Sequence, residues 1–316
     1  MTRTRLTFNG RDEWLEARKD GIGASEVGTI VGLNPWETPY QLWRRKIGLD
    51  APKPMTKAMI RGHILEDGVA RYFAEETGRE IIKSSVEDFM FIDKEKPFLR
   101  VSPDRTYWLD GMPKNDDNKG ILECKTADRM EVDVENIPMY WFCQVQMNLG
   151  IAEYTHGSLA WLSGGQGLDF GHVDMQLVPD YFGWLKEEVE RFWVDNIKGG
   201  QEPELSNIND VLVKHAKHTN AKIIEANADI IKMYDELKVV REDIKALEAK
   251  ETKMEDAIKI AMLDAEALMR NGKVLVTWKA PKASMKFDSK RFIAENPELA
   301  KRYMVPTQGA RRFLIK

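Results

Sequence analysis

The sequence reads FLRVSPD at residues 98–104 and ILECK at residues 121–125, and DGMPKNDDNKG fills 110–120 between them. Both outer runs have the length and apolar character of short strands. The insert is rich in Gly, Pro, Asn and Asp, which tolerate the backbone angles that a chain reversal needs. We therefore expect a hairpin connection that brings Asp104 of the first strand beside Glu123 of the second.

Two carboxylates placed side by side raise each other's pKa unless they share a cation, so a hard divalent metal is the expected occupant. Lys125 follows Glu123 by two residues, and in a strand both side chains leave the same face. An ammonium group beside a metal-bound water can orient or activate a nucleophile, or neutralise charge that develops on a phosphate. The alternative interpretation is an ordinary hairpin with charged surface side chains.

At these residues the sequence resembles the PD-(D/E)xK nuclease superfamily. More narrowly it resembles the YqaJ-type viral recombinase, or phage lambda exonuclease-like, family. Four blocks carry this resemblance and occur in the family's order: WLEAR (14–18) with GASEV (23–27), RGH (61–63) with Glu66, SPD (102–104) with LECK (122–125), and QVQM (144–147).

The resemblance implies a Mg2+-dependent DNA exonuclease of the phage recombination type. Such an enzyme trims a duplex from its 5′ ends and leaves a 3′ single strand for a single-strand annealing protein. Two rivals remain open. An endonuclease or repair nuclease can share the fold, since fold alone does not fix function, and a non-catalytic protein that binds DNA ends as a scaffold is the rival outside enzymes.

The family's site residues map onto positions of this sequence. The resemblance implies that Asp104 and Glu123 hold two Mg2+ ions, for which Mn2+ can substitute, with help from Glu66 and the backbone carbonyl of Cys124. Lys125 would then position or deprotonate the attacking water. The resemblance also places the amide of Gln144 beside the metal site as a catalytic residue; a core glutamine with an internal hydrogen bond is the alternative.

Three residues are expected to contact DNA phosphate. Residues 12–18 predict a helix that Gly21 and Gly23 end, and Ser25 then stands as the N-cap of the next helix. The resemblance assigns Arg18 and Ser25 to the phosphate at the DNA end. Arg129, in the loop after Lys125, is able to reach a phosphate. The alternative is a plain helix cap with a solvated arginine.

The order of elements predicts an α/β (α+β) fold, a restriction-endonuclease-like core with a mixed central sheet flanked by helices. The strongest patterns in it are a long helix at 56–77, a buried helix at 138–149 and a strand pair at 154–162 and 168–175. Gly199 to Pro203 read as a domain boundary. We therefore expect an exonuclease domain at 1–200, a connector and coiled-coil region at 201–270, and a basic, aromatic-containing module at 271–316.

The coiled-coil prediction rests on a heptad pattern. One position is held by Ile223, Ile230, Leu237, Ile244 and Ile258, with Glu251 as the break; the position three residues later is held by Ala226, Met233, Val240, Leu247, Met254 and Ala261. Such a seam either pairs with another chain or folds back as an antiparallel hairpin. In those two cases Glu251 marks a polar layer or the bend, respectively.

Charge is unevenly distributed along the 316 residues. The net charge is −4, but residues 271–316 hold 11 Lys and Arg and 3 acids, so this segment carries +8 and the rest −12. Phe287, Phe292, Tyr303 and Phe313 lie among the basic residues. This module is therefore a candidate for DNA contact or for docking a partner protein.

No apolar run approaches the roughly 20 residues that span a bilayer, and the first residues lack the apolar core of a signal peptide. We expect a soluble cytoplasmic protein, encoded by a phage or prophage in its bacterial host, with no membrane partner. Its expected partners are double-stranded DNA ends, an annealing protein and copies of itself. The two cysteines, Cys124 and Cys143, are too few for a disulfide framework and are expected to be reduced and buried.

Overall fold

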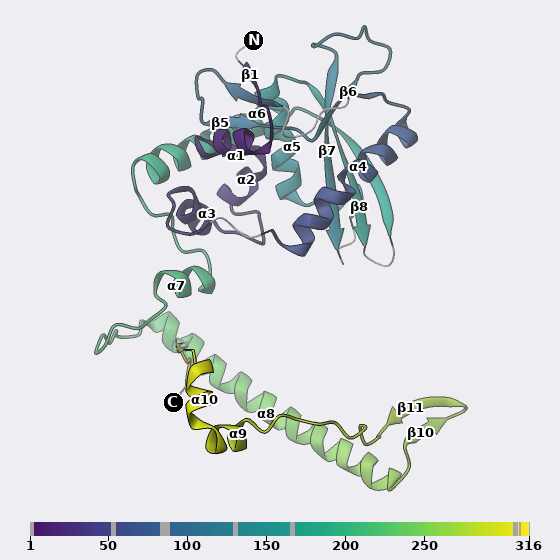
Figure 1. Ribbon diagram of the computed structural model, residues 1–316, viewed down its shortest axis with the longest axis vertical. Helices are drawn as coiled ribbons and strands as arrows, with labels where there is room; N and C mark the ends of the chain where they lie inside the picture. Colours follow the sequence, from purple (N-terminus) through teal and green to yellow (C-terminus); the bar gives the residue numbers. More distant parts are fainter. Residues whose placement is uncertain are drawn as a thin grey trace. The chain divides into compact units, whose positions relative to one another are not determined.

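The structure is a computed structural model that describes residues 3–51, 55–82, 89–128, 132–164, 168–305, 309 and 311–315. The chain divides into two compact units, residues 1–214 and 215–316 (Figure 1). The helices of the first unit are α1 (Arg11–Lys19), α2 (Ala24–Ile30), α3 (Pro39–Lys46), α4 (Lys57–Thr77), α5 (Met139–Ala152), α6 (Pro179–Arg191), the π-helix η1 (Phe192–Lys198) and α7 (Ile208–Lys214).

A mixed five-stranded sheet is the centre of the first unit. Its strands, in spatial order, are β3 (Ile81–Ile82), β6 (Arg105–Trp108), β7 (Lys119–Asp128), β8 (His156–Gly164) and β9 (Asp169–Gln176). β7 and β8 run parallel and the other pairs antiparallel. The parallel pair needs a crossover, and α5 provides it.

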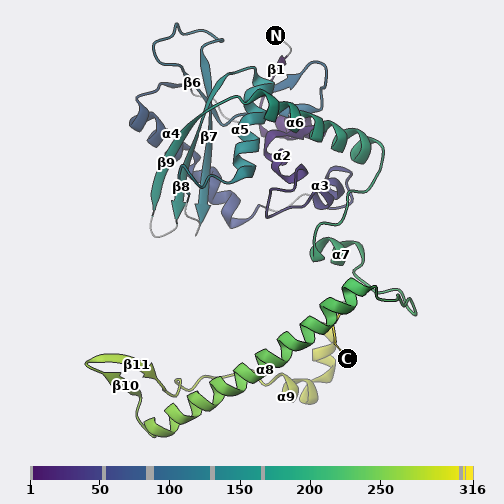
Figure 2. The same ribbon diagram turned by 180° about the vertical axis from the view of Figure 1, so that it is seen from behind.

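Helices cover both faces of this sheet (Figure 2). Leu122 and Cys124 of β7 pack with Val69 and Phe73 of α4. Because side chains alternate along a strand, Glu123 leaves β7 on the opposite face, where α5 lies. The expected α/β core, a mixed sheet flanked by helices, is confirmed.

The first predicted strand, 98–104, is shorter than expected and does not pair with β7. β5 (Leu99–Val101) belongs to a four-stranded sheet in the order β1 (Arg3–Thr7), β4 (Phe89–Asp93), β5, β2 (Ile22–Gly23). The strand that pairs with β7 begins only at Arg105. Pro103 lies between the two strands and has no N–H to give to a ladder, which accounts for the break. The hairpin is confirmed, but its first strand is β6 rather than 98–104.

The long helix α4 has the predicted bounds. The Thr56 side chain accepts the N–H of Met59 as N-cap, and Gly78, with φ 71°, ends the helix in the left-handed conformation. Its apolar stripe is buried only in the second half. Met59 and Ile64, in the first half, are exposed although the helical spacing of the apolar residues would direct them inward.

The first unit extends beyond the expected boundary near residue 200 to Lys214. Asp210 of α7 is fully buried and accepts hydrogen bonds from the side chains of Thr38, at 2.8 Å, and Gln41, at 3.0 Å. Ser206 donates its backbone N–H to the same carboxylate. These bonds hold α7 against the start of α3.

The second unit is built on α8 (Ala228–Met262), a single helix of 35 residues. After it come the antiparallel strands β10 (Ala267–Arg270) and β11 (Lys273–Thr277), and then α9 (Ser289–Glu295) and α10 (Pro297–Tyr303). Of the two alternatives left open for the heptad seam, a fold-back hairpin with its bend at Glu251 is wrong, because α8 continues through Glu251 without a break. None of the helices in the described ranges is both long and apolar enough to cross a membrane.

Candidate active site

Asp104 immediately precedes β6, at the end of the β6–β7 ladder. Its Oδ2 accepts a hydrogen bond of 2.8 Å from the backbone N–H of Cys124. This bond fixes the carboxylate of Asp104 next to β7, so it lies beside Glu123 as the hairpin predicts.

Glu123 is 1% exposed and is held by three side-chain donors. Its Oε1 accepts hydrogen bonds from Lys125 Nζ, at 2.6 Å, and from Gln144 Nε2, while its Oε2 accepts one of 2.9 Å from Asn148 Nδ2. Gln144 and Asn148 lie one turn apart on α5, and side chains four residues apart share a helix face. Asn148 was not predicted; its spacing from Gln144 was the available signal.

Burial and, after it, the negative charge of Asp104 raise the pKa of Glu123 to about 8. Lys125 opposes this shift but does not cancel it. The carboxyl group of Glu123 therefore keeps its proton to a higher pH than an ordinary glutamate.

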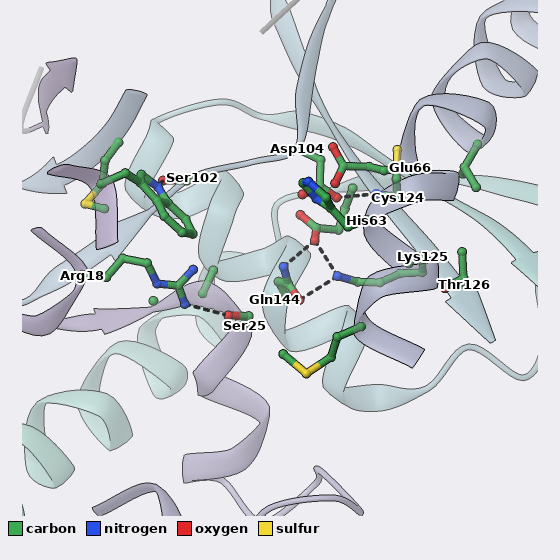
Figure 3. Close-up of a pocket in the computed structure, with 18 of the residues that line it drawn as sticks. Arg18, Ser25, His63, Glu66, Ser102, Asp104, Cys124, Lys125, Thr126 and Gln144 are labelled. Carbon is green, nitrogen blue, oxygen red and sulfur yellow. Dashed lines mark hydrogen bonds and ion pairs between the residues drawn. The ribbon is translucent and has the colours of Figure 1, made fainter. Parts of the chain in front are cut away.

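Lys125 is the cation of the site. Its Nζ contacts Glu123 and also donates a 3.0 Å hydrogen bond to Gln144 Oε1, so the three side chains form a closed triangle (Figure 3). Burial lowers the pKa of Lys125, but the charges of Glu123 and Asp104 outweigh it and the pKa is raised. Lys125 is thus held as an ammonium group.

Glu66 comes to the same place from α4, and Figure 3 shows it beside Asp104 and His63. Its Oε1 accepts a 2.6 Å hydrogen bond from Arg105 Nη1. Burial and the charge of Asp104 raise the pKa of Glu66, although Arg105 opposes the shift. Arg105 can reach Glu66 because it is the first residue of β6 and faces α4.

The donors fit a hard divalent cation. Within the described ranges no three His, Cys, Asp or Glu side chains gather as a ready metal cluster. Glu66 is paired with Arg105 and Glu123 with Lys125. The pKa of both carboxyl groups is nevertheless raised, chiefly by burial and then by the charge of Asp104, so a further cation would favour their ionised form. Mg2+ prefers oxygen donors of this kind.

Cys124 offers oxygen rather than sulfur to such an ion. Its thiol is buried, and burial with the charges of Asp104 and Glu123 raises the thiol pKa well above its usual value, so a thiolate is disfavoured. The N–H and C=O of a residue in a strand leave the same side. Since the N–H points to Asp104, the carbonyl leaves β7 on the side where Asp104 lies. Both cysteines are free and buried, as expected.

Arg18 and Ser25 line the far side of the site (Figure 3). Arg18 Nη2 donates a 3.3 Å hydrogen bond to Ser25 Oγ, and its guanidinium lies 4.7 Å from the ring centroid of Trp14. The indole N–H of Trp14 is fixed in turn by Ser102 Oγ, at 3.2 Å. Arg18 is therefore a cation stacked on a buried ring, which reduces its freedom before any anion binds.

The N-cap of α2 is Gly23, not Ser25 as predicted. The side chain of Glu26, three residues later, reaches back to this N-cap: its Oε2 accepts a 2.9 Å hydrogen bond from the backbone N–H of Gly23. The same carboxylate is paired with Lys46, at 2.8 Å, and with Arg45, at 3.2 Å. Burial raises the pKa of Glu26, but these cations outweigh it and lower the pKa. Ser25 is thereby left free of capping and bonds Arg18.

One cavity of about 480 Å³ contains the predicted residues that the structure describes. Its lining includes the carboxylates with their lysine and glutamine as well as the Arg18–Ser25 pair. These residues are Arg18, Ser25, Glu66, Asp104, Glu123, Cys124, Lys125 and Gln144. Met55 and Met59 add an apolar wall. Arg129, the third predicted phosphate contact, lies outside the described residues.

The YqaJ-like viral recombinase domain family matches this chain over residues 13–155, which include every lining residue named above. The protein YqaJ of Bacillus subtilis (strain 168) is 32% identical over 318 residues, an alignment that covers 97% of this chain and 94% of the relative.

Two solved structures are similar at lower identity. An alkaline exonuclease from Laribacter hongkongensis is 15% identical, with a TM-score of 0.45, over 65% of this chain and 98% of its own. A phage related exonuclease from Haemophilus somnus 129PT is 12% identical, with a TM-score of 0.39, over 57% of this chain and 96% of its own.

Proposed function

The chain belongs to the YqaJ-like viral recombinase family, and from that premise we propose that it is a Mg2+-dependent nuclease that degrades double-stranded DNA from its ends. The observation that carries the proposal is a single cavity that combines buried carboxylates, an ammonium group and a separate arginine seat. The carboxylates and the ammonium group are suited to the hydrolysis of a phosphodiester. An enzyme that acts at a DNA end also needs a site for a second phosphate at a fixed distance from the bond that is cleaved, and the arginine seat can provide it.

Asp104 and Glu123 would hold the metal, with Glu66 and the carbonyl of Cys124 as further oxygen donors. Mg2+, when bound, lowers the pKa of a coordinated water and neutralises charge on the phosphate. Glu123 is positioned for this role by α5, because its two donors from Gln144 and Asn148 fix the rotamer before a ligand arrives.

Lys125 would orient the attacking water and stabilise negative charge on the phosphate rather than remove a proton. Its pKa is raised, so it remains protonated and can only donate. Gln144 and Glu123 each accept one of its protons, which leaves the third for a ligand in the cavity. Of the two roles expected from the sequence, positioning and deprotonation, the charge state supports positioning.

Arg18 and Ser25 would bind the terminal phosphate. A phosphate is recognised well by a guanidinium whose geometry is already fixed, and stacking on Trp14 provides that. A terminal seat in the same cavity as the carboxylates supports exonuclease action over cleavage within a continuous strand. By resemblance to the family, the strand consumed is the 5′-ended one, and the 3′ overhang serves a single-strand annealing protein.

The decisive experiment uses a linear duplex labelled at either the 5′ or the 3′ end, incubated with Mg2+ or with a chelator. We expect loss of the 5′ label only with Mg2+, and none with Lys125→Ala. Lys119→Ala is the matched control, because Lys119 lies on the same strand, is paired with Asp116 and is outside the cavity lining.

A circular duplex separates the rival activities. An exonuclease leaves it intact, whereas an endonuclease of the same fold opens it. Absence of digestion of every substrate, with Mg2+ or Mn2+, would refute the catalytic proposal and leave a DNA-end-binding scaffold.

A further inference from the structure

The helix α8 exposes most of the heptad seam residues that lie within it. Over its 35 residues, roughly 52 Å of helix, Met233 is 62% exposed, Val240 49% and Leu247 64%. Helices of this length are stabilised mainly by packing of the apolar face rather than by intrinsic propensity. The seam therefore needs a partner surface. Because α8 is one uninterrupted helix, its second half cannot fold back to provide that surface.

The charges that flank the seam indicate which surface fits. Arg241 and Glu248 lie on one side of the seam near the middle of α8, and Asp243 and Lys250 lie on the other. None of these four side chains has an ion pair with another residue that the structure describes. They are available for pairs across an interface.

In a parallel pair of α8 helices, these positions conflict. Asp243 would lie near Glu248 of the second copy, and Glu251, at a seam position, would face its own counterpart across the core. Two carboxylates buried against each other are strongly unfavourable. Only part of this is offset by the attraction of Glu236 to Arg241 and of Lys250 to Glu255.

In an antiparallel pair centred between Lys245 and Ala246, the middle of the helix, the conflicts disappear. Arg241 then lies opposite Glu248 of the second copy and Asp243 opposite Lys250, each twice by symmetry. A shift of the pair by one heptad in one direction would place Asp243 opposite Asp243 of the second copy. A shift in the other direction would place Lys250 opposite Lys250 of the second copy. The flanking charges therefore select one direction and one register.

The seam residues agree with that register. Ile244 meets Leu247 of the second copy, and Leu237 meets Met254. Glu251 lies opposite Val240 rather than opposite itself, and Arg241 of the second copy is within about 1.5 Å along the axis. Glu251 would destabilise the other pairings, but in this one it lies near a cation. A single polar seam residue can specify the register of a coiled coil in this way.

We propose that α8 is a self-association surface that pairs two copies of this chain through an antiparallel two-helix coiled coil centred between Lys245 and Ala246. The proposal is independent of the nuclease activity. It requires only α8, and it assigns the seam to a second copy rather than to a different protein.

Cysteine cross-linking tests the direction and the register. Chains with Leu237→Cys and chains with Met254→Cys are mixed under reducing conditions and then oxidised with a glutathione redox buffer. We expect a disulfide-linked dimer from the mixture and none from either variant alone, because like positions lie roughly 25 Å apart along the axis, far beyond disulfide reach. The unsubstituted chain, whose cysteines are buried, is the control. Dimers from each variant alone would show a parallel pair and overturn the proposal.

Sedimentation of the full chain tests the charges. Glu248→Arg sets two arginine pairs against each other in the antiparallel register and should weaken dimerisation about tenfold, equivalent to ~1.4 kcal/mol. The swap Arg241→Glu with Glu248→Arg should restore it. In a parallel pair Glu248→Arg would instead strengthen association by facing Asp243. A chain that stays monomeric at all concentrations, or a stronger dimer with Glu248→Arg, would refute the inference, and neither result bears on the nuclease activity.

Discussion

Lowering the pH is expected to weaken Mg2+ binding in a way that the structure makes quantitative. The pKa of Glu123 is raised to about 8 by burial, with the charge of Asp104 adding to the effect. A carboxyl group with a raised pKa is protonated below that value, and it must lose its proton to bind a metal. Metal affinity should therefore rise with pH up to about 8 and then level off.

The size of the effect follows from one proton per metal-binding event. Each pH unit below the pKa costs ~1.36 kcal/mol, a factor of ten in affinity. Between about pH 8, where Glu123 is half protonated, and pH 6 the Kd for Mg2+ should increase roughly fiftyfold, or ~2.3 kcal/mol. The raised pKa of Glu66 acts in the same direction and steepens the lower part of the curve.

Calorimetric titration of Mg2+ into the DNA-free protein at several pH values measures this directly. Glu123→Gln removes the titrating group and should bind weakly with a shallower pH dependence. Glu75→Gln, an exposed carboxylate on the same helix as Glu66, should keep the slope of the unsubstituted protein. A Kd that is equal at pH 6 and pH 8, or that falls as the pH is lowered, would refute the reasoning.

Three other perturbations have defined outcomes. Asn148→Ala should lower the free energy of unfolding by about 1–3 kcal/mol in urea denaturation, because a buried Glu123 oxygen loses its donor. Arg18→Ala should reduce the preference for 5′-phosphorylated over 5′-hydroxyl duplex ends by about tenfold or more, the size of a hydrogen bond to a charged group, while an unchanged ratio of degradation rates would place the terminal phosphate elsewhere. Gly28→Ala should destabilise the first unit by about 1–3 kcal/mol, because the added Cβ would lie 2.6 Å from the Cβ of Tyr140; thermal unfolding at the wild-type Tm would contradict this crowding.

The pairing of Asp104 with Glu123 could be predicted because it depends on local features. The turn-forming insert fixes a hairpin, and period-two alternation fixes which side chains share a face with Glu123. The family resemblance then added Glu66, which no local pattern connects with the hairpin. Alternation alone cannot say which helix lies against a face.

The partner of each charged side chain was harder to predict. Arg105 is one of several arginines near the motif, and its pairing with Glu66 depends on how α4 lies across β6. The strand break at Pro103 was visible in the sequence, yet its consequence, that β5 and β6 belong to different sheets, is set by tertiary packing. Asn148 lies one helical turn after Gln144, which placed it on the same face of α5. Its apolar sequence neighbours indicated a core position, where an asparagine usually bonds to the backbone.

The buried helix α5 ties the chemistry of the site to the integrity of the whole unit. Nine of its 14 residues are buried, and the two that bond Glu123 lie on the helix that also carries Cys143, Val145 and Leu149 of the main core. The low-stability segments that open first in a protein are those with few buried apolar contacts. Because Glu123 is held by one of the most deeply buried helices, gentle heating would unfold peripheral segments before it disturbs this carboxylate. Loss of activity on heating would therefore coincide with cooperative unfolding of the core instead of preceding it.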